Sequence, residues 1–157
     1  MPVDVLTEIV IDRPRGEVAA YAQDPSHAPR WYANIESVTW RTPEPMRVGS
    51  RLEFVAHFLG RQLAYTYEVV EYLPGERLVM RTAQGPFPME TTYTWEPVDD
   101  TRTRMRLRNR GEPSGYSRIA TPIMAAAIRR ANRKDLAKLK RIVERGEANG
   151  PSRGRSG

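Results

Sequence analysis

The chain has 157 residues, which suits one domain that encloses a core, or a core with a cavity. It has no cysteine and only two histidines, which excludes disulfides and thiol nucleophiles and argues against a histidine-rich metal site. Hydrophobic residues make up 39% and charged residues 28%, and the net charge is +6. No apolar run reaches the length of a membrane span, and residues 1–4 lack the features of a signal peptide. We therefore expect a cytoplasmic protein without membrane insertion.

The first quarter of the chain predicts a strand followed by two short helices. Residues 3–11 alternate with a period of two, which is typical of a strand with one buried face. Pro14 then suits the first turn of a helix. A second short helix is expected over residues 27–32, and a further strand over residues 37–41.

The middle of the chain predicts an antiparallel meander. Apolar and polar residues alternate through several segments, and residues that favour turns, such as Gly60 and Pro74-Gly75, separate them. The segments are residues 51–59, 62–71, 77–83 and 89–96.

The last predicted strand, residues 102–110, carries an arginine at every second position. Its other face mixes polar and apolar side chains, namely Thr103, Met105, Leu107 and Asn109. Such a mixture favours the wall of a ligand cavity over a close-packed core. The simpler alternative is a half-buried strand whose charges protect the sheet from edge pairing.

A long amphipathic helix is predicted over residues 121–145. Thr121-Pro122 suits its start, and the apolar residues that follow recur at helical spacings. Gly146 suits its end. Residues 147–157 are rich in Gly, Ser and Arg and read as a disordered basic tail, so the predicted domain covers residues 1–146.

Several short motifs, taken in order, resemble a known superfamily. They are Ile11-Asp-Arg-Pro14, the spacing from Asp24-Pro25 to Trp31, Tyr67-Glu-Val69 before Pro74-Gly-Glu-Arg-Leu78, and Gly111-Glu-Pro113 before a basic helix. Over about residues 3–145 this order is similar to the START-like, or SRPBCC, superfamily, and more narrowly to its bacterial polyketide cyclase/dehydrase-type members.

The resemblance implies an α+β helix-grip fold. In that fold a curled antiparallel sheet of about seven strands surrounds a long C-terminal helix, with two short helices after the first strand. A deep cavity lies between sheet and helix. The superfamily includes lipid carriers, hormone receptors, cyclases and co-chaperone activators, so the resemblance does not fix a reaction.

Alternation along the strands predicts which side chains face this cavity. Several are aromatic residues with a hydroxyl group, which must find a hydrogen-bond partner when buried, and a ligand can provide one. Each alone is also consistent with plain core packing. The predicted ligand-binding residues are Trp31, Phe54, Phe58, Tyr65, Tyr67, Met89, Tyr93, Trp95, Met105, Asn109, Met124 and Ile128.

Candidates for catalysis are few. Tyr93 and Asn109 fall on the inner faces of successive strands, where they could polarise a carbonyl and stabilise an enolate. The simpler alternative is that they only satisfy each other or the backbone. His57 falls on the outer face and is expected at the surface. The sequence predicts no metal and no cofactor.

Three classes of function remain open. The first is a protein that binds a hydrophobic, aromatic or polycyclic small molecule in its interior. The second is a cyclase or aromatase that uses the same pocket. The third is an interaction module whose basic surface meets an acidic protein or nucleic acid. Nucleic acid is disfavoured because no aromatic platform accompanies the basic residues. The sequence does not determine the ligand or the oligomeric state.

Overall fold

A computed structural model describes residues 3–58, 60–85, 88–112 and 120–146. The chain starts with β1 (Val3–Ile11), α1 (Arg15–Ala22), the short 3-10 turn η1 (Pro25–His27) and α2 (Ala28–Trp31). It continues with β2 (Ile35–Trp40), β3 (Arg51–Phe58), β4 (Arg61–Leu73), β5 (Arg77–Gln84), β6 (Met89–Asp99) and β7 (Arg102–Gly111). The helix α3 (Ala120–Glu144) follows.

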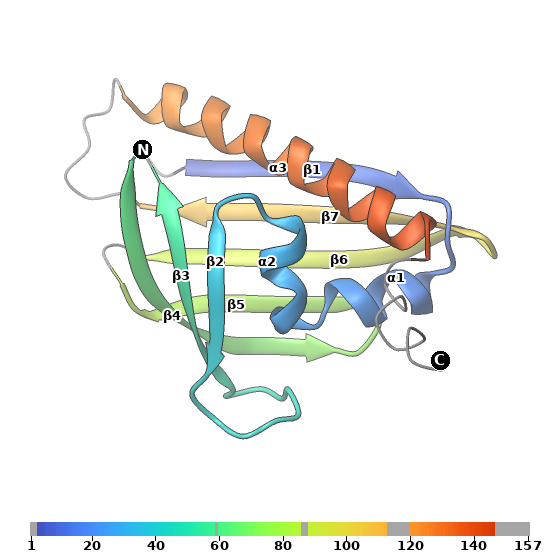
Figure 1. The fold of residues 1–157 in the computed structure, drawn as a ribbon, viewed down its shortest axis with the longest axis horizontal. Coiled ribbons are helices and arrows are strands. Elements are labelled where there is room, and N and C mark those ends of the chain that lie inside the picture. The colour runs from blue at the N-terminus through green and yellow to red at the C-terminus, as the bar shows by residue number, and fades with distance from the viewer. Residues whose placement is uncertain (1–2, 59, 86–87, 113–119, 147–157) are drawn as a thin grey trace, which may run out of the picture.

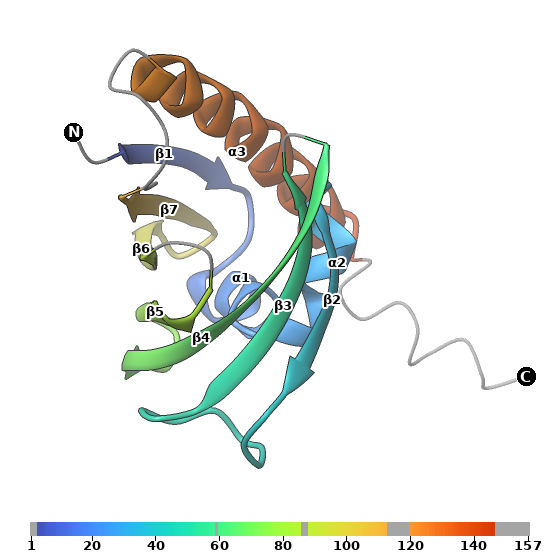
Figure 2. The same ribbon diagram turned by 90° about the vertical axis from the view of Figure 1, so that its left-hand side faces the viewer.

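The seven strands form one antiparallel sheet in the order β1-β7-β6-β5-β4-β3-β2. The sheet curls strongly, and α1, α2 and α3 lie on its concave side (Figures 1 and 2). Register shifts between β4 and β5, at Thr66/Tyr67 and Val69/Glu71, are the kind of irregularity that bends a sheet. This is the helix-grip fold, so the predicted fold class is confirmed.

The predicted element boundaries hold to within about three residues, and the largest difference is at β6, which continues to Asp99 where residue 96 was predicted as its end. Pro14 precedes α1 with φ −61°, the value that its ring imposes. Gly60, in the turn between β3 and β4, has φ +76°, and Gly146, just after α3, has φ +77°. Both values lie in the left-handed region that glycine adopts without strain. The predicted tail, residues 147–157, lies outside the described residues.

One end of the concave interior is packed solid. Val18 of α1, Trp31 of α2, Trp95 of β6, Met105 of β7 and Leu139 of α3 are buried in one continuous apolar cluster. Burial of this apolar surface is the main stabilising term of such a domain. We call these five residues and their neighbours the packed end.

The arginines of β7 lie on the outer face of the sheet, and each pairs with an acidic side chain. Adjacent strands supply most of the partners, because β1 and β6 flank β7 and carry acids in register. The pairs are Arg102–Asp99 (2.7 Å), Arg104–Glu96 (3.6 Å), Arg106–Glu8 (3.0 Å), Arg108–Asp4 (2.6 Å) and Arg110–Glu90 (3.6 Å). The positive charge predicted for this face is therefore largely compensated.

Among the described residues, no helix is long and apolar enough to cross a membrane.

Candidate functional site

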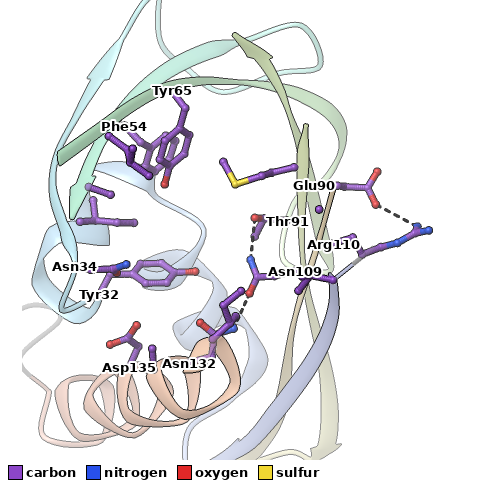
Figure 3. Close-up of a pocket in the computed structure, with 18 of the residues that line it drawn as sticks. Tyr32, Asn34, Phe54, Tyr65, Glu90, Thr91, Asn109, Arg110, Asn132 and Asp135 are labelled. Atoms are coloured by element: carbon purple, nitrogen blue, oxygen red, sulfur yellow. Dashed lines mark hydrogen bonds and ion pairs between the residues drawn. The ribbon is translucent and has the colours of Figure 1, made fainter. Parts of the chain in front are cut away.

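A cavity of about 190 Å³ lies between the sheet and α3, at the end of the interior that α1 does not fill (Figure 3). Residues from every strand except β5, from α3 and from the segment after α2 line it. Its lining residues are Val3, Tyr32, Asn34, Ile35, Phe54, Ala56, Leu63, Tyr65, Tyr67, Met89, Glu90, Thr91, Tyr93, Asn109, Arg110, Gly111, Met124, Ala127, Ile128, Ala131, Asn132 and Asp135.

One wall of the cavity is an aromatic cluster. The rings of Phe54 and Tyr65 stack with centroids 5.6 Å apart, and Tyr67 meets both rings edge-on. These residues are cross-strand neighbours on β3 and β4, where Phe54 pairs with Tyr65 and Leu52 with Tyr67. Flat apolar faces of this kind suit a ring-containing ligand.

A pair of tyrosines joins the end of α2 to the sheet at the cavity wall. The hydroxyls of Tyr32 and Tyr93 lie 2.6 Å apart. One hydroxyl donates to the other, so the proton of the accepting hydroxyl remains available to a ligand. Burial is the main cause that raises the pKa of both phenols above the usual value of 10.0. The pair therefore presents a neutral hydrogen-bond donor at ordinary pH.

A chain of hydrogen-bonded polar side chains runs along the cavity wall from the sheet to α3. The hydroxyls of Tyr67 and Thr91 lie 2.7 Å apart, and Asn109 Nδ2 donates to Thr91 Oγ1 at 3.1 Å. Asn132 Nδ2 donates to Asn109 Oδ1 at 2.6 Å (Figure 3). Burial raises the pKa of Tyr67 to about 12. The chain holds these groups in fixed positions, because each is bonded to its neighbour.

Asp135 places a carboxyl group at the cavity from α3. The residue is 3% exposed, and its Oδ1 accepts a hydrogen bond from the backbone N–H of Ala33 at 3.1 Å. Burial raises the pKa of this carboxyl, although the Ala33 bond and the charge of Lys138 oppose the shift. A carboxyl group that is shielded in this way can bind a polar ligand group or exchange a proton with it.

Glu90 and Arg110 lie at the rim and point away from the cavity (Figure 3). Glu90 pairs with Arg81 at 2.6 Å and with Arg110 at 3.6 Å on the outer face of the sheet. Asp135 is therefore the charged side chain that turns towards the interior at this site.

The structure brings eight of the twelve predicted ligand-binding residues to the cavity: Phe54, Tyr65, Tyr67, Met89, Tyr93, Asn109, Met124 and Ile128. Trp31, Trp95 and Met105 point inward as expected, but they do not line it. These three lie at the packed end, where Trp95 stacks on Tyr93 at 5.9 Å and Trp31 meets Tyr93 edge-on at 6.4 Å. The side chain of Phe58 lies outside the described residues.

The two catalytic candidates do not form a pair. Tyr93 bonds to Tyr32, whereas Asn109 bonds to Thr91 and Asn132. The inner face of β7 is core at Thr103, Met105 and Leu107, and only its end, at Asn109, reaches the cavity. His57 is exposed on the outer face, as expected, and pairs with Glu36. No group of three or more His, Asp or Glu side chains within the described ranges could hold a metal ion.

Sequence reasoning missed several polar residues of the site, and three of them stand out: Tyr32, Asn132 and Asp135. Two of them carried a signal. Asn132 and Asp135 occupy positions that continue the apolar stripe of α3 from Ile128 to Leu139, at spacings of four, three and four. A polar residue on a stripe that faces the core indicates a buried hydrogen-bonding site. Tyr32 follows a four-residue helix, and nothing local marks its orientation.

Comparison with solved structures supports the fold. TTHA0849 from Thermus thermophilus has a TM-score of 0.77 at 20% identity, over 89% of this chain and 96% of that one. The Zhui aromatase/cyclase from Streptomyces sp. R1128 has a TM-score of 0.76 at 15% identity, over 100% and 99% of the chains. A START superfamily protein from Mycobacterium smegmatis has a TM-score of 0.70 at 13% identity, over 94% and 97%.

No curated protein sequence matches the chain significantly. The family model described as polyketide cyclase/dehydrase and lipid transport, in contrast, matches residues 2–144, nearly the whole of the described chain. The expected resemblance is thereby confirmed. This chain belongs to the polyketide cyclase/dehydrase and lipid transport family.

Proposed function

We propose that the protein binds a hydrophobic molecule of one or two rings, with one hydrogen-bonding group, in the cavity between the sheet and α3. The observation that supports this proposal is that the cavity has an apolar side and a polar side. Phe54 and Tyr65 form an aromatic wall, and Tyr32, Tyr93 and Asp135 supply fixed polar groups. Such a lining would hold an apolar body and orient one polar group.

The size of the cavity limits the ligand. A cavity of about 150 Å³ in another protein holds benzene. The volume here, about 190 Å³, is therefore suited to one ring or two fused rings. A polycyclic ligand, which the sequence also suggested, would require the walls to move apart. Met89 and Met124 on the wall are flexible enough to adapt to different ring shapes.

The hydrogen bonds already present favour a ligand with an oxygen acceptor. The Tyr32–Tyr93 pair retains one proton, which would donate to a carbonyl or phenol oxygen. Asp135 Oδ1 is engaged by Ala33, so its other oxygen would accept from a ligand hydroxyl. A phenol could satisfy both groups, because its oxygen accepts and its proton donates.

Three probes test this proposal: naphthalene, β-naphthol and the four-ring pyrene. Titration followed by tryptophan fluorescence is suitable, because Trp31 and Trp95 both contact the ring of Tyr93. We expect β-naphthol to bind about tenfold more tightly than naphthalene, the gain from one good hydrogen bond, and pyrene to bind weakly. Failure of both two-ring probes to bind, or preference for pyrene, would contradict the proposal.

The tyrosine pair allows a sharper test. Tyr93→Phe alone should change the affinity for β-naphthol little, because Tyr32 can then donate its own proton to the ligand. The double variant Tyr32→Phe/Tyr93→Phe removes the donor and should abolish the preference over naphthalene. Tyr72→Phe is the matched control, because Tyr72 does not line the cavity. A double variant that keeps the full preference would exclude the pair as the anchor.

The second candidate is a cyclase-type enzyme that uses the same cavity. The position of Asp135 favours it, because burial raises the pKa of this carboxyl and thus makes its ionised form a stronger base. Asp135 would take a proton from the carbon beside a substrate carbonyl, while the tyrosine pair stabilises the resulting enolate oxygen. Product analysis with a linear poly-β-carbonyl thioester tests this. Asp135→Asn should then reduce turnover at least about a hundredfold, the typical contribution of a general base.

A further inference from the structure

The two basic regions of the protein differ in whether their charges are compensated. The arginines of β7 all have acidic partners, as described above. The outer face of α3 carries five basic side chains that form no ion pair with any described residue. We call these residues the cationic stripe: Arg130, Arg133, Lys134, Lys138 and Arg141.

Helix geometry places the stripe opposite the core. At about 100° per residue, Arg130, Lys134 and Arg141 fall within about 20° of one line along the helix. Leu139, which is fully buried, lies on the other side. All five stripe residues are exposed. From Arg130 to Arg141 the stripe extends about 16 Å, at 1.5 Å per residue.

Towards the start of α3, the line through Arg130, Lys134 and Arg141 reaches an apolar residue. Ile123, seven residues before Arg130, is 71% exposed, the largest exposed fraction among the large hydrophobic side chains described. Pro122 and Ala126 beside it are also exposed. The outer face of α3 therefore has an apolar start and a cationic continuation, and it is turned away from the sheet (Figures 1 and 2).

We propose that this outer face of α3 docks on an anionic lipid surface, with Ile123 entering the interface and the cationic stripe lying on the headgroups. Lysines and arginines that form no ion pair are attracted to anionic lipids, and an apolar residue on the same face adds insertion. The face has no aromatic residue to stack on bases, which disfavours nucleic acid, and it lacks the Trp and Tyr that, together with Arg, most often anchor a fixed protein interface.

This surface lies on the opposite side of α3 from the cavity, so docking does not depend on the proposed ligand. Cosedimentation of the full chain with vesicles at physiological salt is the test. One set of vesicles is pure phosphatidylcholine, and the other contains about one third phosphatidylglycerol. We expect binding to the second set alone, because the attraction requires anionic lipid.

Two double variants test whether vesicle binding depends on the cationic stripe or only on the net charge of the protein. Lys134→Gln/Arg141→Gln removes two charges from α3, and Arg106→Gln/Arg108→Gln removes two from the paired face of β7. We expect at least a tenfold loss of vesicle affinity for the first variant and little change for the second. Circular dichroism would confirm that both are folded. Equal losses in the two variants would overturn the proposal, because binding would then depend only on net charge.

Ile123→Ser distinguishes a lipid surface from other polyanions. It should weaken vesicle binding severalfold, because the residue no longer enters the interface, and leave binding to duplex DNA or polyglutamate unchanged. Tighter binding of wild-type protein to DNA or polyglutamate than to anionic vesicles would overturn the proposal, as would absence of vesicle binding.

Discussion

The two ends of the concave interior use the same elements but differ in packing. β6 contributes Trp95 to the packed end and Thr91 to the cavity, and β7 contributes Met105 and Asn109 in the same way. α3 gives Leu139 to the first and Met124, Ile128, Asn132 and Asp135 to the second. The difference arises because α1 and α2 fill one end only. An inward-facing residue of the sheet is therefore part of the core where α1 or α2 packs on it, and part of the cavity wall where neither does.

The largest expected difference between the two ends is in the response to truncation. Leu139→Ala should lower the free energy of unfolding by about 3 kcal/mol, because the void that it leaves is enclosed by packed side chains. Ile128→Ala should cost less than about 1 kcal/mol, since this half-buried side chain already borders empty space. Urea denaturation measures both. If Ile128→Ala lowered the free energy of unfolding by as much as Leu139→Ala, the space beside Ile128 would have to be filled with side chains.

The buried phenols should make the protein sensitive to alkali. The pKa of Tyr67 is raised from 10.0 to about 12, so between these values the unfolded chain ionises while the folded protein keeps its proton. Stability should therefore fall as pH rises through this window, by roughly 3 kcal/mol in total from Tyr67 alone. Denaturation at a series of pH values measures the slope. Tyr67→Phe should reduce it, and Tyr72→Phe, outside the cavity, is the control.

Enlarging an alanine should have opposite effects at the two ends. Ala19→Leu at the packed end should lower the free energy of unfolding by about 2 kcal/mol through overpacking. Ala56→Leu projects into the cavity and should be nearly neutral for stability, yet it should weaken binding of β-naphthol at least about tenfold. Calorimetry of unfolding and of binding tests both. Unchanged binding in Ala56→Leu would place the ligand elsewhere.

The smallest expected effect concerns Asp135. Because burial raises its pKa above the usual 3.8, the folded state holds the proton more tightly, and stability falls as pH rises from 3.8 through the folded pKa. Asp135→Asn should therefore be more stable than wild type at neutral pH, by roughly 1.4 kcal/mol for each pKa unit of the shift. The gap should close as pH approaches 3.8. A constant gap at all pH values would exclude titration of Asp135 as its cause.

The sequence determined the strand faces, the helix ends and the order of elements. These depend on local properties: alternation along a strand, spacing along a helix, and the backbone preferences of residues such as Pro14 and Gly146. For this reason, eight of the predicted lining residues lie at the cavity. Asn132 and Asp135 could also have been recognised, because they interrupt an apolar stripe.

Only the tertiary structure decided which inward residues surround empty space and which charges are paired. Trp95 and Met105 became core because α1 packs on β6 and β7, and Trp31 became core because α2 holds it against Tyr93. No local pattern encodes these contacts. The Tyr32–Tyr93 pair joins residues 61 positions apart, and Arg108 finds Asp4 across 104 positions. Such long-range contacts follow from the closing of the sheet, when β7 pairs with β1 and α3 crosses the concave face.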